Sequence, residues 1–455
     1  MVIDQSGSGD FRTIGEAIRA SVVPGTLITV KPGIYREALV IDRDVEIVGE
    51  GDRARIVVDV TNTHAVTVTA DRAVVRNLTV RAVGTKEHLG AVRVQRGRVV
   101  IEGCDLTSAI GSVVYITGKD SAPVIRDCGI RDGKGPGVIV WEQGQGTIEQ
   151  CVISGNAFSG VEISEGGNPT VRGCEIRDGQ GPGVAVFEQG QGTIEQCVIS
   201  GNASSGVQIS EGGNPTVRDC EIRDGQAGGV LVGDEGQGTI ERCVISGNVL
   251  AGVEIKTGGN PTVRDCEIRD GQQCGVYVQE QGQGMIEQCV ISGNAYAGVV
   301  IKTGGNPTVR DCQIRDGQSA GVFVHEQGQG TIEQCVISGN AEAGVAITTG
   351  GNPTVFDCEI RDGQEGGVLV FEQGQGTIER CVISGNTDAG VEISEGGNPI
   401  VRDCQIRDGQ SAGVHVYEQG QGTFTGNTLA GNALGAWDIT ATAGNVVRTE
   451  NTPNV

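Results

Sequence analysis

Aromatic residues, histidines and long apolar runs are all scarce in this chain. Only 3% of its 455 residues are aromatic and four are histidines, so any core must be built from aliphatic side chains. No apolar run approaches the roughly 18 residues of a membrane helix, and no membrane partner is expected. The histidines are scattered and no CxxC pair occurs, so ligand spacing predicts neither a metal site nor a cofactor.

Basic residues are also in short supply. Lysine and arginine total 34 against 57 aspartates and glutamates, which gives a formal net charge of −23. A surface that binds nucleic-acid phosphates needs clustered Lys and Arg, so no nucleic-acid partner is expected. The charges are interleaved rather than gathered in a tail, and their main predicted effect is solubility.

A signal peptide is missing from the first residues. The opening MVIDQSGSGDF has neither a basic start nor an apolar stretch. Without an export signal, the fifteen cysteines are predicted to be free thiols in a reducing compartment, and the expected location is the cytoplasm.

What the chain does have is a repeat. The stretch TIEQCVISGN occurs word for word at 147–156, 193–202 and 331–340, and fourteen cysteines from Cys104 to Cys404 follow one another at intervals of 23 residues after a first step of 24. Two half-repeats form a doublet, and doublets begin at Ala122 and then at Pro169, Pro215, Pro261, Pro307, Pro353 and Pro399. A fixed period of this size indicates a solenoid.

Each half-repeat contains three short runs of alternating residues separated by Gly, Asn and Pro, a pattern typical of strands and turns rather than helices. The predicted fold is all-β: a single-stranded right-handed parallel β-helix of about 17 rungs. In the doublet that starts at Pro169, the side chains predicted to point inward are those of Val171, Cys174, Ile176, Val184 and Val186. Those predicted to point outward are Arg172, Glu175, Arg177, Ala185 and Phe187.

Four segments are predicted along the chain. Residues 1–27 form an N-terminal cap in which FRTIGEAIRAS (11–21) is an amphipathic helix with Phe11, Ile14, Ala17 and Ile18 on one face. Irregular rungs follow at 28–121 and regular rungs at 122–427. Residues 428–455 lose the repeat pattern and are interpreted as a C-terminal cap, with Trp437 packed on the last rung.

The repeated cysteines are predicted to stack inside the coil, because free Cys behaves as a small apolar residue. Asn427 occupies the same place in the last rung. Cys274 lies outside this series and is predicted to be the one accessible thiol.

The opening GSGDFRTIGEAI and ITVKPGIYREALVIDRDVEIVGEG resemble the first rungs of pectin methylesterases. The repeats NPTVRDCEIRDGQ and EQGQGTIEQCVISGN resemble the right-handed β-helix repeat family of carbohydrate-binding and sugar-hydrolase type. Within that family they are most similar to the β-helix of an F-box ubiquitin-ligase subunit and its bacterial relatives. This resemblance implies a β-helix with a binding role. Catalytic segments of the methylesterases, polygalacturonases and pectate lyases have no counterpart here, so no catalytic residue is carried over.

Positions that differ among the internal copies gather on one predicted face, which comprises the turn after RDGQ or SGN and the outward residues of the next strand. Exposed aromatic residues there suit an interface or a sugar. The candidate binding residues on this face are Trp141, Phe187, Lys256, Tyr277, Gln279, Tyr296, Lys302, Phe323, His325, Phe371 and Tyr417. The alternative is that these exposed positions vary without function.

Two catalytic possibilities arise on the same face. Lys302, His325 and Tyr277 could act as base and acid beside a uronate carboxylate. A column of glutamates recurs in almost every rung, so pairs at glycosidase spacing arise without implying catalysis.

The preferred interpretation is a non-catalytic scaffold that binds a protein or peptide partner along this face. The alternative is a protein that binds or modifies an acidic polysaccharide, of lyase, esterase or epimerase type, with the same face. An acidic rod that mimics nucleic acid is a third possibility, but the aromatic and lysine positions disrupt its negative face. The chain is expected to be a monomeric rod or part of a larger multidomain protein.

Overall fold

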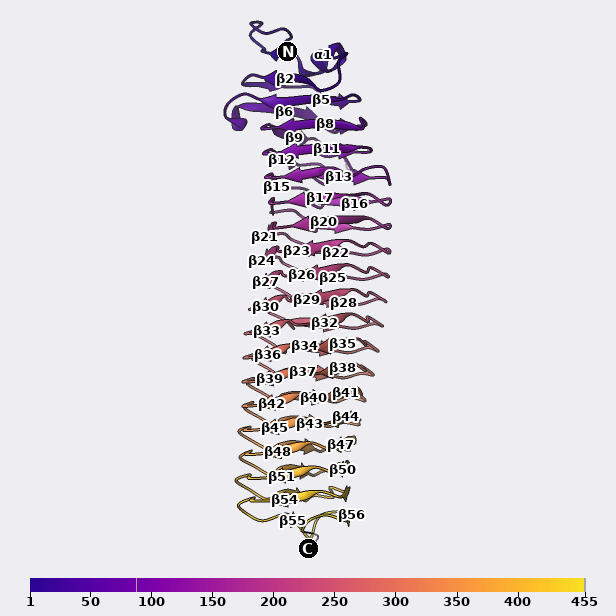
Figure 1. Ribbon diagram of the computed structural model, residues 1–455, viewed down its shortest axis with the longest axis vertical. Helices are drawn as coiled ribbons and strands as arrows, with labels where there is room; N and C mark the ends of the chain where they lie inside the picture. The colour runs from indigo at the N-terminus through magenta and orange to yellow at the C-terminus, as the bar shows by residue number, and fades with distance from the viewer. Residues whose placement is uncertain (87, 454–455) are drawn as a thin grey trace. The chain divides into compact units, whose positions relative to one another are not determined.

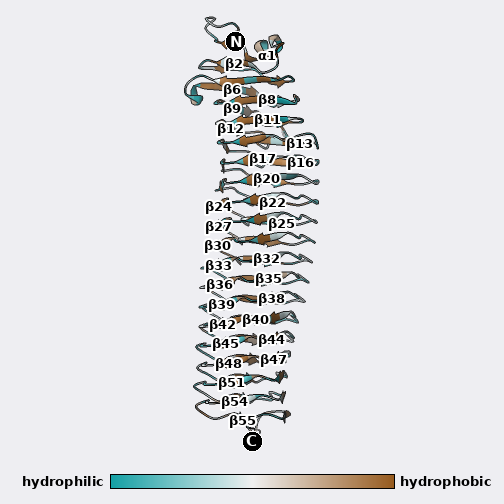
Figure 2. Ribbon diagram, in the orientation of Figure 1, coloured by the Kyte–Doolittle hydropathy of each residue, from teal (hydrophilic) through white to brown (hydrophobic). Residues whose placement is uncertain are grey.

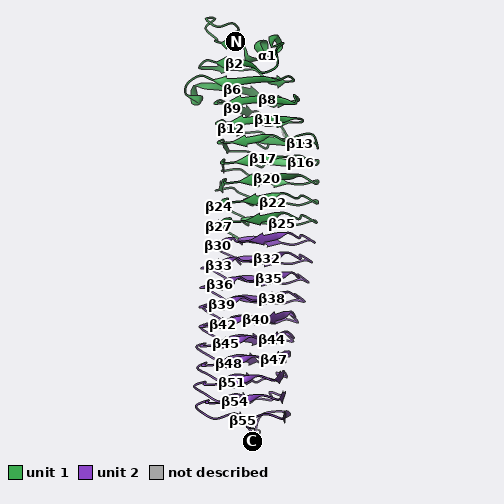
Figure 3. Ribbon diagram, viewed as in Figure 1, with its two compact units in different colours: residues 1–227 green, residues 228–455 purple. Residues whose placement is uncertain are grey.

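The computed structural model describes residues 1–86 and 88–453. Residues 454–455 of the predicted C-terminal cap therefore lie outside the described residues. The chain divides into two compact units, residues 1–227 (unit 1) and 228–455 (unit 2), shown in two colours in Figure 3. Each unit is a stack of turns, and each turn contributes one short strand to each of three parallel sheets (Figure 1).

Unit 1 begins with a short helical region. Its helices are α1 (Ile14–Ala20) and the 3₁₀ turn η1 (Arg53–Arg55). Sheet 1 of this unit consists of β1 (Val2–Ile3), β2 (Thr26–Val30), β5 (Val45–Gly49), β8 (Arg72–Arg76), β11 (Arg98–Glu102), β14 (Val124–Arg126), β17 (Gln145–Glu149), β20 (Asn168–Arg172), β23 (Thr193–Glu195) and β26 (Thr216–Arg218).

Sheet 2 of unit 1 consists of β3 (Gly33–Tyr35), β6 (Ile56–Thr61), β9 (Thr79–Val83), β12 (Asp105–Ser108), β15 (Gly129–Arg131), β18 (Val152–Ser154), β21 (Glu175–Arg177), β24 (Val198–Ser200) and β27 (Glu221–Arg223). Sheet 3 consists of β4 (Leu39–Ile41), β7 (Val66–Val68), β10 (Val92–Val94), β13 (Val114–Thr117), β16 (Val138–Trp141), β19 (Val161–Ile163), β22 (Val184–Val186) and β25 (Val207–Ile209).

Unit 2 repeats the same three sheets. Its sheet 1 consists of β29 (Thr239–Glu241), β32 (Thr262–Arg264), β35 (Met285–Glu287), β38 (Thr308–Arg310), β41 (Thr331–Glu333), β44 (Thr354–Phe356), β47 (Thr377–Glu379), β50 (Ile400–Arg402), β53 (Gly422–Thr425) and β56 (Val446–Thr449). Its sheet 2 consists of β30 (Val244–Ser246), β33 (Glu267–Arg269), β36 (Val290–Ser292), β39 (Gln313–Arg315), β42 (Val336–Ser338), β45 (Glu359–Arg361), β48 (Val382–Ser384), β51 (Gln405–Arg407) and β54 (Thr428–Ala430).

Sheet 3 of unit 2 consists of β28 (Val230–Val232), β31 (Val253–Ile255), β34 (Val276–Val278), β37 (Val299–Ile301), β40 (Val322–Val324), β43 (Val345–Ile347), β46 (Val368–Val370), β49 (Val391–Ile393), β52 (Val414–Val416) and β55 (Trp437–Ile439). Over the described residues the solenoid has about 19 turns of about 23 residues. The predicted number, about 17, is too low because β1 adds pairing before the predicted first rung and β54 to β56 continue it after residue 427.

Strict register keeps equivalent residues one above the other. Val138 is paired with Val161, and Val161 with Val184, so successive turns place identical side chains in the same column. The alternation of the sequence then separates core from surface: Val171, Cys174, Ile176, Val184 and Val186 are all at most 2% exposed, as predicted. Figure 2 shows the apolar residues concentrated along the strands.

The corners of the coil explain the recurring Gly, Asp and Gln residues. Asp178 and Gly201 occupy the same corner in successive turns with φ of 55° and 63°, a left-handed conformation that Asp tolerates and Gly adopts freely.

Cross-turn ion pairs on sheet 1 explain why the repeat is a doublet. Its strands alternate between TIE and TVR, and Arg218 contacts Glu195 of the preceding turn at 2.5 Å. The same pairing links Arg172 to Glu149 in unit 1, and in unit 2 it links Arg264 to Glu241 and Arg310 to Glu287. Opposite charges in adjacent strands stabilise the sheet, whereas identical half-repeats would place like charges together.

The cysteine series lies inside the coil, and every one of its members is at most 2% exposed. Asn427 is fully buried in the same column and accepts a hydrogen bond from the backbone N–H of Cys404 at 2.9 Å. The prediction that Cys274 is accessible is wrong, because it is only 4% exposed and packs with Ala251, Ala297 and Val300. It belongs to a second buried column of small residues in turns of unit 2 that precede strands of sheet 3: Ala251, Cys274, Ala297, Ala320, Ala343, Ala389 and Ala412.

Both ends of the chain differ in detail from the sequence interpretation. Helix α1 buries Ile14, Ala17 and Ile18 against β2 and β4, but Phe11 precedes the helix and forms a bridge with Ile3. Trp437 packs edge-on against Phe424 of the last predicted rung, as expected, with 5.3 Å between ring centroids, but it is itself part of a further strand, β55. The boundaries at residues 27, 121 and 427 stay predictions.

Among the described residues, no helix has the length and apolarity needed to cross a bilayer.

Candidate functional site

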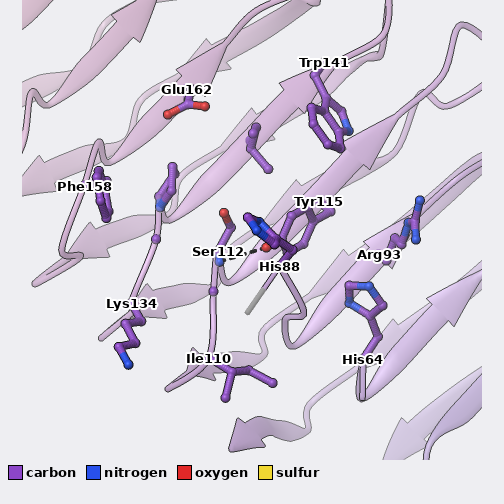
Figure 4. A pocket seen from close by; sticks show the side chains of 14 residues that line it. His64, His88, Arg93, Ile110, Ser112, Tyr115, Lys134, Trp141, Phe158 and Glu162 are labelled. Atoms are coloured by element: carbon purple, nitrogen blue, oxygen red, sulfur yellow. Dashed lines mark hydrogen bonds between the residues drawn. The ribbon is translucent and has the colours of Figure 1, made fainter. Parts of the chain in front are cut away.

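A cleft of about 670 Å³ opens on the outer face of sheet 3 in unit 1 (Figure 4). This volume is within the range of sites that hold small ligands. Strands β10, β13, β16 and β19 supply one wall, and the turns that precede these strands and β7 supply the other. The cleft is lined by His64, His88, Arg93, Ile110, Gly111, Ser112, Tyr115, Lys134, Gly135, Pro136, Ile139, Trp141, Phe158 and Glu162.

Strand register determines the order of the residues on the strand wall. Arg93 is paired with Tyr115, Tyr115 with Ile139, and Ile139 with Glu162. Adjacent parallel strands are about 4.8 Å apart. Arg93 and Tyr115 therefore belong to neighbouring turns, while Glu162 lies about 10 Å further along the cleft than Tyr115.

Two glycines make room for Tyr115 under the turns. A Cβ on Gly111 would lie 2.7 Å from the Tyr115 hydroxyl, and a Cβ on Gly90 would lie 2.8 Å from its ring. The backbone N–H of Ser112 donates a hydrogen bond to that hydroxyl at 3.1 Å. The ring is thus fixed on the outer face although only 7% of the residue is exposed.

His64 packs edge-on against Tyr115, with 5.5 Å between ring centroids. The backbone N–H of Gly90 donates to His64 Nδ1 at 3.0 Å, so the neutral ring carries its proton on Nε2. Burial and the charge of Arg93 lower the pKa of His64, so the ring is neutral near pH 7. The arrangement places a neutral imidazole and a phenol side by side.

Glu162 is the one carboxylate among the residues that line this cleft. Burial, followed by repulsion from Glu188, raises its pKa to about 7. Glu162 therefore exchanges a proton near neutral pH, and in its protonated form it does not repel an anionic ligand.

Basic and aromatic side chains complete the cleft. Arg93, Lys134 and His88 contribute basic groups, and Lys134 and His88 are exposed. Trp141 is half-buried, and Phe158 is 60% exposed at the tip of its turn. A cleft with this lining matches a ligand that combines sugar rings or other flat apolar faces with negative charge.

Unit 2 carries a second set of aromatic residues on its own sheet 3. Phe323 stacks on His325 at 4.5 Å and meets Tyr296 edge-on at 6.4 Å, measured between ring centroids. The ammonium of Lys302 lies 5.8 Å from the centroid of the Tyr277 ring and 3.6 Å from a carboxylate oxygen of Glu326. Burial lowers the pKa of His325, so this ring is neutral near pH 7.

The other candidate binding residues fall into separate environments. Gln279 donates to Glu254 at 3.1 Å and Lys256 lies 3.7 Å from the same carboxylate. Tyr417 donates to Glu392 at 2.8 Å. The structure thus groups Tyr277, Tyr296, Lys302, Phe323 and His325 together, and separates them from Lys256, Gln279 and Tyr417. Phe371 lines the same small pocket of unit 2 as Tyr296 and Phe323, and Trp141 lines the cleft of unit 1. Phe187 is half-buried on sheet 3 of unit 1.

The sequence interpretation missed most of the unit 1 cleft. His64, His88, Arg93 and Tyr115 lie in the irregular rungs, which have no internal copies to compare. One signal was present: two of the four histidines fall within 25 residues of each other in this segment. No group of three or more His, Cys, Asp or Glu side chains suited to a metal ion occurs among the residues described.

Comparison with known proteins defines the class. The chain matches the family described as the right handed beta helix region over residues 64–218, 159–309, 205–355 and 297–452. These matches overlap and cover most of the sequence. The chain therefore belongs to the right-handed β-helix family, and the predicted fold is confirmed.

Individual relatives are more distant. A stretch of 122 residues is 34% identical to a putative pectinesterase of Arabidopsis thaliana, and it spans 23% of this chain and 34% of the relative. The chain also resembles the A-module of a mannuronan C-5 epimerase from Azotobacter vinelandii, at 15% identity and a TM-score of 0.38 over 96% of this chain and 93% of the other. A pectin methylesterase from Aspergillus niger shows 16% identity and a TM-score of 0.35 over 55% of this chain and 85% of the other.

Proposed function

We propose that the cleft of unit 1 binds an acidic polysaccharide made of uronate sugars. The observation that carries this proposal is the grouping of three basic side chains, Arg93, Lys134 and His88, with the aromatic rings of Trp141 and Phe158. The whole chain has a net charge of −23, so a basic cleft is a local departure from its surroundings.

Each component of the cleft has a role in this proposal. The aromatic rings offer flat apolar faces to the sugar rings. The guanidinium of Arg93 pairs with a uronate carboxylate through two parallel hydrogen bonds, a geometry that favours Arg over Lys. Lys134 lies on the turn wall and provides a second charge for a neighbouring sugar.

The relatives support this proposal over the scaffold interpretation. Their names describe a pectinesterase and an epimerase of mannuronan, which are activities on polysaccharides. The sequence favoured a non-catalytic scaffold for a protein partner, with polysaccharide binding or modification as the alternative. Of those two interpretations, the second agrees with the relatives and with the charge of the cleft.

A proton-transfer reaction is a second candidate function, favoured by the contact between His64 and Tyr115. If Arg93 neutralises a uronate carboxylate, these two rings are the nearest groups that could remove or deliver a proton at the adjacent carbon. Glu162 lies two turns from Tyr115, about 10 Å away across the strands of sheet 3, and so would contact a different sugar. Lys302, His325 and Tyr277 of unit 2 stay weaker candidates, because Lys302 is already engaged with Tyr277 and Glu326.

Calorimetric titration tests the binding proposal. A hexamer of galacturonate or mannuronate should bind, and a neutral glucan hexamer should bind far less. The double variant Trp141→Ala/Arg93→Gln should lose at least about tenfold in affinity, because both anchors of the ligand are removed. The control Phe187→Ala/Arg172→Gln also removes one aromatic ring and one positive charge from unit 1, and should bind normally.

Equal losses in both double variants would show that general charge rather than the cleft attracts the ligand. Three readouts then distinguish the reactions: a new double bond detected by absorbance, methanol release from a methyl-esterified galacturonate hexamer, and inversion at a sugar carbon detected by NMR. Loss of any such activity in His64→Gln and Tyr115→Phe, with binding retained, assigns proton transfer to these rings.

A further inference from the structure

Unit 2 contains a second hollow on the outer face of its sheet 3, with a volume of about 180 Å³. Its floor consists of three alanines that pack together, Ala320, Ala343 and Ala346, each at most 6% exposed. Leu369 and Phe371 extend this floor along the strand wall. The hollow exists partly because Ala346 is small where the neighbouring turns have Phe323 and Leu369.

Aromatic rings close one end of the hollow. Phe323 packs against the alanine floor and is held between two other rings, stacked on His325 and edge-on to Tyr296. Tyr296 remains 43% exposed. These contacts fix Phe323, so the end wall is formed before any ligand arrives.

Carboxylates form the turn wall. Glu342 and Glu365 line the hollow, and Asp388 occupies the equivalent position in the following turn. Ser319 donates a hydrogen bond to Glu342 at 2.5 Å. Burial, followed by repulsion from Glu342, Asp388 and Glu392, raises the pKa of Glu365.

These carboxylates lack the partners that neutralise others in the same unit. On sheet 2, for example, Arg361 contacts Glu359 at 2.8 Å and Asp362 at 2.6 Å. Within the described part of unit 2, Glu342, Glu365 and Asp388 form no such ion pair. The hollow therefore combines an apolar floor and an aromatic wall with negative charge that the protein does not compensate.

We propose that this hollow of unit 2 receives an arginine side chain from a protein partner. The aliphatic stem lies on Ala346 and Leu369, the guanidinium stacks on the rings of Tyr296 or Phe323, and Glu342 and Glu365 accept its hydrogen bonds. Arginine suits all three surfaces, because its planar group stacks on aromatic rings and pairs with carboxylates. This site is separate from the proposed polysaccharide cleft and takes a ligand of opposite charge.

Binding of a labelled peptide tests the proposal. A fluorescein-labelled peptide of Gly-Ser-Arg repeats should raise its anisotropy with the full chain, and a Gly-Ser-Gln peptide should not. The variant Glu342→Gln/Glu365→Gln should bind the Arg peptide at least about tenfold more weakly. The control Glu395→Gln/Glu418→Gln removes the same charge from exposed positions of unit 2, and should change affinity less than about twofold.

A filling variant tests the hollow itself. Ala346→Phe should abolish binding without harming the fold, because neighbouring turns already hold Phe323 and Leu369 at this position. Absence of binding by the wild-type chain overturns the proposal. So does an equal loss in the two charge variants, which would indicate non-specific attraction. Binding of a glucosamine hexamer at the hollow in place of the Arg peptide overturns it too, because the ligand would then be an amino sugar.

Discussion

At the scale of single residues, the cysteine series inside the coil is explained by packing, without any reaction of the thiols. Cys335 is 1% exposed, and its sulfur lies 3.2 Å from the carbonyl oxygen of Glu333 and 3.5 Å from that of Val309. A small apolar group with a weak S–H donor fits this place, whereas thiolate chemistry requires access and a stabilised charge. Burial raises the pKa of Cys274 to about 12, so this cysteine, which lies outside the series, is also a poor source of thiolate.

Thiol titration checks this account of the cysteines. In the native protein all fifteen thiols are buried. A reagent such as dithionitrobenzoate should therefore label less than about one thiol per chain within minutes. Full reaction should appear only in denaturant. Rapid native labelling of Cys274, identified by mass spectrometry, would contradict its packing among Ala251, Ala297 and Val300.

Glu162 provides a prediction about pH. Its folded pKa of about 7 is above the ordinary value of 4.5, so folding favours the protonated form. The free energy of unfolding of the wild type therefore falls relative to that of Glu162→Gln as the pH rises from about 4.5 to about 7. Above that range the difference between the two proteins is constant. The melting temperature of the Gln variant should match the wild type near pH 4 and exceed it by a few degrees near pH 8. A difference that does not change with pH would show that Glu162 titrates normally.

At the scale of elements, helix α1 is anchored by a residue from a later turn. The backbone N–H groups of Ile14 and Gly15 donate to the two carboxylate oxygens of Glu37 at 2.7 and 2.9 Å. Thr13 adds a local cap, accepting from the N–H of Glu16 at 3.2 Å. A carboxylate that satisfies free N–H groups at a helix N-terminus stabilises the helix.

Replacing Glu37 by Ala should loosen α1 without unfolding the solenoid. The expected cost is about 1 kcal/mol, comparable to the loss of a cap residue. Hydrogen exchange of the amides of residues 14–20 should accelerate by roughly fivefold, while the strands of sheet 1 should exchange as before. Glu50→Ala removes an exposed carboxylate that pairs with Lys31, and it should leave the exchange of α1 unchanged. Equal acceleration in both variants would mean that charge, not capping, holds the helix.

The strands of the repeats could be predicted from the sequence because one physical rule generates all of them. Alternation identifies Val184 and Val186 as core residues, and a constant period aligns each with its copies.

The cleft could not be predicted in this way. Tyr115 alternates outward and would be expected in solvent, yet Gly90 and Gly111 in two different turns allow the chain to cover it. Such packing depends on how turns fold over the sheet, which strand periodicity does not encode. The buried column of small residues that contains Cys274 could not be predicted for the same reason.

At the scale of the whole chain, the two units share a repeat but differ in what their outer faces offer. The lining of the unit 1 cleft includes Arg93 and Lys134, whereas the lining of the unit 2 hollow includes Glu342 and Glu365. Both sites lie on sheet 3, where small residues leave room beside the strands. On sheet 1, Arg and Glu side chains of successive turns pair with each other, whereas the outer face of sheet 3 carries the linings of both proposed sites.

The central claim is that a uronate polysaccharide binds in the unit 1 cleft, and a crystal structure with a bound galacturonate or mannuronate hexamer tests it most directly. The account predicts sugar rings against Trp141 and Phe158, with one carboxylate paired to the guanidinium of Arg93 and the adjacent carbon facing His64 and Tyr115. Density for the hexamer on sheet 1 or sheet 2, or on the aromatic residues of unit 2, with the cleft empty, would contradict it.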